Sequence, residues 1–156
     1  MKQSAGLLLY KHLKKKLFVF LVHPGGPLWK NKDLGSWSIP KGEFLSAEKA
    51  IDAALREFEE ETGQAITAKH FIELKPVRLK SGKTVYAWAC EQDIDAATIR
   101  SNTFSLEWPP KSGRFHDFPE IDRGAWFEVH EALEKINPAQ QDFIQELEVL
   151  LKNHNE

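Results

Sequence analysis

The sequence predicts an α/β (α+β) sandwich, in which helices pack on a mixed β-sheet. Short apolar runs of strand length share the chain with segments whose apolar residues recur at the helical period. The 156 residues are 42% hydrophobic and 28% charged, an ordinary globular mixture that suits one sizeable core. Because we find no internal repeat or low-complexity linker, we expect a single domain over residues 1–156.

The first strands are expected at residues 5–10 and 17–23, two apolar runs that a Lys-rich turn would join as a hairpin. Proline and glycine at residues 24–27 then end the second strand and begin a long loop. At residues 37–39 Trp and Ile alternate with serine, which predicts a short half-buried strand stopped by the next proline. Residues 41–43 are expected to be loop.

The clearest helix is predicted over residues 47–63. Ser46 is a good N-cap, and Gly63 suits the left-handed position that ends a helix. Apolar residues at i, i+3, i+4, i+7, i+8 and i+11 form one continuous stripe: Ala47, Ala50, Ile51, Ala54, Leu55 and Phe58. One face of this helix is therefore expected to pack on the sheet.

Beyond this helix the pattern predicts the second half of the sheet and two shorter helical segments. Further strands are expected at residues 65–77, 83–91, 103–108 and 124–129. Residues 109–119 are rich in proline, glycine and charge and are expected to be a loop. A brief helix or turn is expected at residues 131–136, and Pro138 suits the first turn of a last amphipathic helix.

The predicted first helix carries acids at the wrong end. Because a helix C-terminus is partly negative, an acid in its last turns is misplaced by a few tenths to ~1 kcal/mol. Glu57, Glu60 and Glu61 fall within an arc of about 100° that borders the apolar stripe, whereas Glu59 points elsewhere. A solvated acidic face would stand opposite the core instead. Three converging carboxylates favour Mg²⁺ or Mn²⁺, and the lack of His and Cys among them disfavours zinc.

Composition excludes several other classes of protein. The net charge of −2 creates no basic field for nucleic acid, and the run Lys14–Lys16 fits a solvated turn. No apolar run approaches the ~20 residues that a membrane helix needs, so we expect no membrane association. The single cysteine, Cys90, excludes an intrachain disulfide and favours a reducing cytoplasm.

The segment from Gly42 to Gln64 resembles the Nudix box, G-x5-E-x7-R-E-U-x-E-E-x-G-U, where U is a bulky apolar residue. Every fixed letter is present at its spacing, and Phe58 occupies the first U position. Gln64 departs from the pattern at the last position, which mainly packs the turn after the helix. Residues 35–42 and the pair Trp126-Phe127 are also similar to the family.

The resemblance implies a Nudix-like α/β/α sandwich that hydrolyses a nucleoside diphosphate linked to another group. It implies that Glu57, Glu60 and Glu61 are ligands of Mg²⁺ or Mn²⁺, with Glu57 also a candidate general base. The carbonyl of Gly42 would complete the metal site. Arg56 would orient the carboxylates through charge-assisted hydrogen bonds.

Other acids surround the box. Glu48 would be a supporting charge near the metal, or simply an acid that the helix dipole stabilises. The family commonly has one further carboxylate outside the box, for which Glu120 is the first candidate and Glu107 the second. The alternative to this functional role is that Glu120 is an ordinary solvated acid on a loop.

Candidates for substrate binding are cationic or aromatic. Lys41 would stand beside the phosphates, although a plain surface lysine fits equally well. Trp29 in a polar loop and His116 could stack on a base, whereas Trp37 fits the core better. Arg114 and His116 belong to a long loop that could close over a polyphosphate or be an ordinary insertion.

The segment Pro40-Lys41-Gly42 looks similar to the diadenosine-polyphosphate and inositol-pyrophosphate branch of the family. We therefore expect a Mg²⁺-dependent pyrophosphohydrolase whose partner is a small nucleotide, most simply a dinucleoside polyphosphate such as Ap4A. ADP-ribose, nucleotide sugars and nucleoside triphosphates are the alternatives. A non-catalytic nucleotide-binding regulator would usually have eroded carboxylates, and a decapping enzyme a basic surface or an added domain. The sequence leaves the oligomeric state open.

Overall fold

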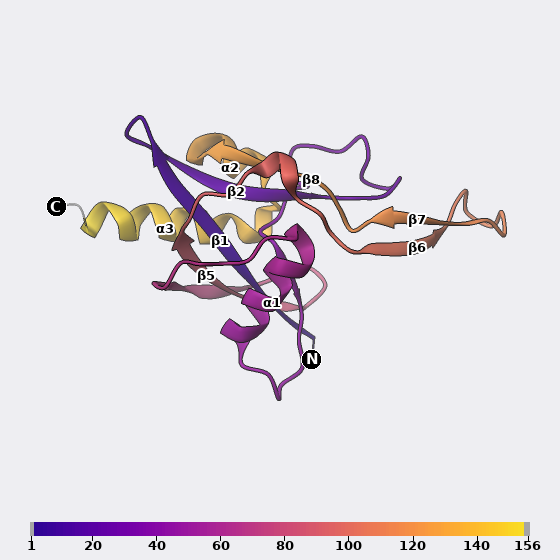
Figure 1. Ribbon diagram of the computed structural model, residues 1–156, viewed down its shortest axis with the longest axis horizontal. Helices are drawn as coiled ribbons and strands as arrows, with labels where there is room; N and C mark the ends of the chain where they lie inside the picture. Colours follow the sequence, from indigo (N-terminus) through magenta and orange to yellow (C-terminus); the bar gives the residue numbers. More distant parts are fainter. Residues whose placement is uncertain (1, 155–156) are drawn as a thin grey trace.

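The computed structural model describes residues 2–154 (Figure 1). The predicted N-terminal hairpin is confirmed. Strands β1 (Gln3–Leu13) and β2 (Lys16–Pro24) pair antiparallel, and the turn between them places Lys14 and Lys15 at φ of 51° and 66°. Two successive residues with positive φ are what a tight hairpin turn requires, because such turns match the twist of the strands.

The main sheet is mixed, as predicted. Its strands run in the order β4-β5-β1-β2-β8, and β3 pairs with β1 outside this path. The strands beyond the hairpin are β3 (Lys41–Glu43), β4 (Ile72–Arg78), β5 (Thr84–Glu91) and β8 (Ile121–Glu128). Strands β1 and β5 are parallel, and the other pairs are antiparallel. Because β1 is long, its second half pairs with β2 while its first half pairs with β3.

Helices cover both faces of this sheet, which gives the predicted sandwich. Successive residues of a strand point to opposite faces, so each strand contributes to two separate cores. On one face, α1 (Ala50–Thr62) packs Phe58 among Leu7 and Phe20. On the other, α2 (Val129–Lys135) and α3 (Gln141–His154) cover Leu8 and Leu21. Short 3₁₀ turns lie at Ala96–Thr98 and Pro138–Gln140.

The predicted limits of the first helix are right at its end and wrong at its start. Gly63 has φ 75° and donates its backbone N–H to Glu59 O at 2.7 Å, so the helix ends as expected. The helix begins at Ala50, three residues after the predicted start, and Ser46 is not its N-cap. Ala47 is exposed and finds no core to pack against, so the apolar stripe is one residue shorter than predicted.

Three other expectations need correction. Residues 41–43 form strand β3 rather than a loop, because they pair with the first half of β1. The predicted loop 109–119 contains strand β7 (Phe115–Pro119), which pairs with β6 (Thr103–Glu107) in a hairpin that extends from the body (Figure 1). Residues 65–71 lie before β4 and are outside any strand.

The remaining predicted elements are close to the observed ones. Trp37 and Ile39 are buried, and the predicted short strand is reduced to isolated bridges from Ser38 to Val22 and from Trp37 to Ile136. The last predicted strand begins three residues early, at Ile121. Within residues 2–154, no helix is both long enough and apolar enough to cross a bilayer.

Candidate active site

The predicted acids lie where α1 crosses strand β3. Glu57 is 14% exposed, and its carboxylate lies directly against the backbone of Gly42. A Cβ added to Gly42 would stand 1.9 Å from Glu57 Oε2 and 2.0 Å from Cδ. Only glycine, which has no Cβ, leaves room here for the Glu57 carboxylate. The position of this carboxylate therefore explains why the predicted box begins with Gly42.

Glu61 is held by the same strand. The backbone N–H of Lys41 donates to Glu61 Oε1 at 3.0 Å, which ties the end of α1 to the start of β3. A small cavity of about 210 Å³ opens beside this contact. Its lining residues are Val22, Pro24, Ser38, Ile39, Lys41, Glu61, Glu120 and Ile121.

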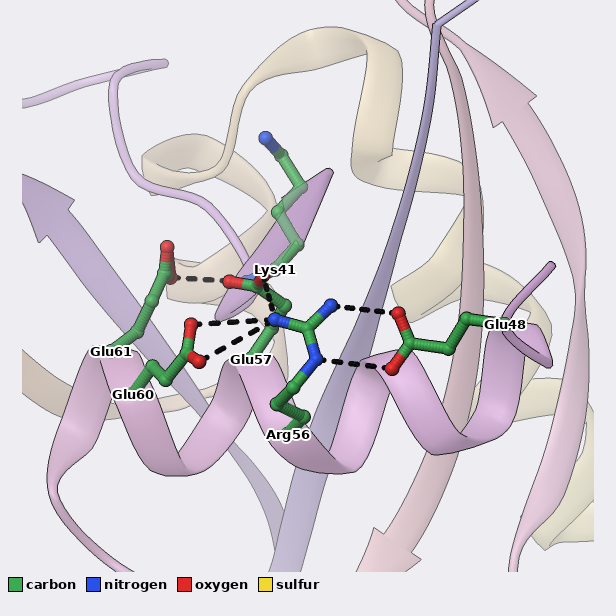
Figure 2. A network of polar contacts seen from close by, with 6 residues as sticks. All are labelled: Lys41, Glu48, Arg56, Glu57, Glu60 and Glu61. Carbon is green, nitrogen blue, oxygen red and sulfur yellow. Dashed lines mark hydrogen bonds and ion pairs between the residues drawn. The ribbon is translucent and has the colours of Figure 1, made fainter. Parts of the chain in front are cut away.

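Arg56 joins three acids from one position on α1 (Figure 2). Its Nε and Nη2 donate to Glu48 at 3.0 and 2.9 Å, a two-pronged contact, and its Nη1 donates to Glu57 Oε1 at 2.7 Å. A longer contact of 3.4 Å reaches Glu60 Oε1. The hydrogen bonds to Arg56 lower the pKa of Glu48, and those to Glu48 and Glu57 raise the pKa of Arg56. This arrangement is the one expected of a residue that orients carboxylates.

Glu120 approaches the cluster from outside the predicted box. Its backbone is fixed by two hydrogen bonds of 2.8 Å, from its N–H to Asn102 O and from Gly25 N–H to its own carbonyl. Burial is the main cause of the raised pKa of Glu57 and Glu61, and the charge of Glu120 adds to it. The first candidate for the further carboxylate lines the same small cavity as Glu61. Glu107 does not, because its carboxylate accepts N–H groups at the turn of the β6–β7 hairpin.

Burial is the main influence on the pKa values of the helix acids Glu57 and Glu61. Burial raises the pKa of Glu61 to about 8, although the Lys41 N–H acts in the opposite direction. Burial also raises the pKa of Glu57, against the effect of Arg56. Oxygen-only donors with raised pKa values suit a hard divalent cation, which would offset the cost of burying them.

The side chains are not gathered as metal ligands in the arrangement described. Within residues 2–154, no three acidic, His or Cys side chains stand close enough to hold one ion. Arg56 engages Glu57 and Glu60, and the Lys41 N–H engages Glu61. Binding an ion would therefore require these carboxylates to exchange hydrogen bonds for coordination.

The predicted substrate contacts are more dispersed. The backbone of Lys41 belongs to the cluster, but its ammonium group points away from the acids (Figure 2), and burial lowers its pKa. Trp29 is 39% exposed, with the Lys32 ammonium 4.9 Å from its ring centre. Arg114 and His116 are exposed. They belong to the β6–β7 hairpin, which extends away from α1 (Figure 1). Trp37 is 4% exposed and belongs to the core, as expected.

Sequence reasoning missed Gln140, which supports the site from the opposite end of the chain. Its side chain is buried, and its Oε1 accepts the N–H of Ile39 at 3.1 Å. Gln140 also contacts Ser38 Oγ. These bonds set the path of the chain just before Lys41 and Gly42. No local pattern could have revealed them, because 101 residues separate the partners.

The raised pKa of Glu61 predicts how stability depends on pH. Its folded value of about 8 lies above the ordinary 4.5, so the native protein binds more protons between them and loses stability as pH rises. Glutamine keeps an acceptor for Lys41 N–H without the charge. In EDTA at pH 8 we expect Glu61→Gln to be more stable than wild type by about 2 kcal/mol, and the difference to vanish near pH 4.

Urea unfolding across this pH range, with Glu59→Gln as the control, measures the effect. An equal pH dependence in wild type and Glu61→Gln would contradict the buried, charge-poor environment of Glu61.

A family model described as the NUDIX domain matches residues 2–147. The chain belongs to the NUDIX family. It is accordingly a Nudix hydrolase, an enzyme that acts on phosphoric anhydrides, and the box predicted at Gly42–Gln64 lies within the matched region. No curated protein sequence matches this Nudix chain significantly.

Solved structures share the Nudix fold at low sequence identity. A Caenorhabditis elegans Ap4A hydrolase binary complex has a TM-score of 0.70 and 18% identity, covering 96% of this chain and 98% of that one. The NUDIX domain of Shewanella oneidensis NrtR, complexed with ADP ribose, has a TM-score of 0.63 and 16% identity, covering 96% of this chain and 87% of that one. A mutT/nudix family protein from Listeria innocua has a TM-score of 0.61 and 18% identity, covering 98% of this chain and 95% of that one. These likenesses establish the fold and not the substrate.

Proposed function

We propose that this Nudix chain is a Mg²⁺-dependent pyrophosphohydrolase that cleaves a phosphoanhydride bond in a dinucleoside polyphosphate such as Ap4A. The observation that carries the proposal is the position of two acids of α1 against strand β3. The Glu57 carboxylate lies against Gly42, Glu61 accepts the Lys41 N–H, and burial raises the pKa of both. Such a cluster is costly unless a cation joins it. The 156 residues would form one catalytic domain.

The Mg²⁺ or Mn²⁺ ion would be held by the carboxylates of Glu57, Glu60 and Glu61 and by the carbonyl of Gly42. The bound ion would offset the charge of the substrate phosphates and make a water molecule more acidic. Glu57 suits the role of general base, because burial raises its pKa toward neutrality. Arg56 holds Glu57 in place at 2.7 Å, and Glu120 is the second candidate for the base.

The shape of the surroundings supports a long substrate with two bases. Trp29 is exposed on the loop after β2, where it could stack on one base. Glu120 follows β7 directly, so we propose that Arg114 and His116 on the β6–β7 hairpin would meet parts of the substrate far from the scissile bond. The Ap4A hydrolase that shares this fold acts on a substrate of the same class.

Two further points belong to the proposal. The NrtR domain of the same fold was complexed with ADP ribose, so ADP-ribose is the leading alternative substrate. The intact acids Glu57, Glu60 and Glu61 favour catalysis over a purely regulatory role. We place the protein in the cytoplasm because its one cysteine, Cys90, is free and buried.

A substrate panel tests the proposed activity. Phosphate-containing products would be measured from Ap4A, ADP-ribose, nucleoside triphosphates and capped RNA, each with Mg²⁺ and with EDTA. We expect the highest kcat/KM for Ap4A and no turnover in EDTA. A clear preference for ADP-ribose would replace the substrate, and tight nucleotide binding without any turnover would favour a regulator.

A further inference from the structure

His23 is a fully buried histidine at the end of β2, and both of its ring nitrogens meet acceptors. Its Nδ1 lies 2.9 Å from Asp122 Oδ1 on β8, and its Nε2 lies 2.7 Å from the backbone carbonyl of Lys32 in the loop that follows β2. The ring of Trp37 packs edge-on against it, with 5.1 Å between ring centres. The ring is therefore shut off from water and depends on these two partners.

The identity of the partners determines how many protons the ring carries. A carbonyl oxygen can only accept, so Nε2 must carry a proton toward Lys32. The carboxylate of Asp122, with 30% of its side chain exposed, is also an acceptor. A neutral imidazole has one N–H and would leave Nδ1 with a lone pair facing the carboxylate at 2.9 Å. With Asp122 as a carboxylate, both contacts are hydrogen bonds when His23 is an imidazolium paired with it.

This one ring connects β2, β8 and the loop that carries Lys32, and both strands border the cavity next to Glu61. Pro24, the next residue, lines that cavity together with Glu120 and Ile121. Gly25 N–H donates to the Glu120 carbonyl, and Gly25 is so close to Pro119 that an added Cβ would stand 2.0 Å from its carbonyl oxygen. The partner of His23 on β8, Asp122, is therefore two residues from Glu120, and Pro24 next to His23 lines the same cavity as Glu120.

We propose that His23 is a positioning residue for the reaction. As an imidazolium, it holds the Lys32 carbonyl and the Asp122 carboxylate at once, which fixes the loop carrying Trp29 and the segment carrying Glu120 relative to each other. The catalytic consequence rests on the proposed function, whereas the protonation state and the anchoring of the loop do not.

The protonation state is tested by NMR of the whole chain labelled with ¹⁵N-histidine at neutral pH. The His23 signal is the one that disappears in His23→Gln. We expect both ring nitrogens of His23 to be protonated in the wild type. In Asp122→Asn the amide can donate to a bare Nδ1, so we expect the ring to have one N–H, at Nε2, and the loop to stay in place. A wild-type ring with a single proton would overturn the proposal.

The anchoring is tested by amide hydrogen exchange, which needs no substrate. Lys32 N–H donates to Trp29 O at 2.9 Å, and Trp29 N–H donates to Gly26 O at 3.2 Å, so these amides report on the loop. We expect faster exchange in His23→Gln and Asp122→Ala, and wild-type exchange in Asp122→Asn. Unchanged exchange in Asp122→Ala would overturn the anchoring even if His23→Gln failed to fold, because Asp122 is partly exposed.

Kinetics then separate positioning from stability. We expect His23→Gln and Asp122→Ala to raise KM by at least about fivefold, with a smaller change in kcat, and Asp122→Asn to stay near wild type. His130→Gln is the matched control, because His130 also pairs with a carboxylate, that of Glu128, but is 76% exposed. An unchanged KM in Asp122→Ala would remove the catalytic role. If no panel substrate were turned over at all, the proposed function would fail while the NMR and exchange results still stood.

Discussion

Replacing Glu57 by glutamine is expected to lower kcat for phosphoanhydride hydrolysis by about 10³-fold, because it removes a proposed metal ligand and the candidate base together. The amide keeps the volume of the side chain and an acceptor for Arg56, which lies 2.7 Å away, so the fold should be retained. Initial rates with saturating Mg²⁺ give the result. Thermal unfolding with and without Mg²⁺ shows in parallel whether cation binding is lost.

Glu59→Gln is the matched control for this experiment. Glu59 lies on the same helix and carries the same charge, but it is exposed and outside the cluster. We expect its rate to remain within about twofold of wild type. A wild-type rate for Glu57→Gln would refute its proposed catalytic role, and a wild-type rate for Glu60→Gln would remove Glu60 from the proposed metal ligands.

Gly42→Ala should disable the same site without removing any of its functional groups. The new methyl group would occupy the space of the Glu57 carboxylate, which lies within 2.0 Å of the added Cβ. Strand β3 is held by its pairing with β1, so the side chain of Glu57 must turn away instead. We expect activity to fall about 100-fold and stability to fall by about 1–3 kcal/mol.

A double-mutant cycle shows whether this loss passes through Glu57. Gly42→Ala is measured in the wild type and in a Glu57→Ala background, where the methyl group no longer meets a carboxylate. We expect the second step to have little further effect on the rate, since the two residues share one space. Losses that multiplied independently would mean that Gly42 acts through the backbone alone.

The acid-rich helix is the element that local pattern describes best. The apolar stripe that ends at Phe58 and the left-handed Gly63 are consequences of residues within a few turns of each other. The start of the helix was harder to predict, because Ser46 has the chemistry of an N-cap but the chain there has no core to pack on. A capping preference worth about 1 kcal/mol does not extend a helix whose first turn would be solvated.

Strands β3 and β7 escaped prediction for a related reason. Residues 41–43 have no alternation of apolar side chains, and they form a strand only because the first half of β1 offers backbone partners. Strand β7 carries exposed side chains on most of its length and gains its order from cross-strand pairing with β6. Both strands are stabilised by hydrogen bonds to distant segments, which periodicity does not record.

The residues around Gly42 show which features of the site the sequence predicts and which depend on the tertiary structure. Spacing along one helix predicts that Glu57, Glu60 and Glu61 share an arc that excludes Glu59, since a helix places side chains at known angles. The crowding at Gly42 and the approach of Glu120 depend on segments 15 and more residues away. Their positions arise from sheet pairing and core packing, which act between residues far apart in the chain and leave no periodic trace in it.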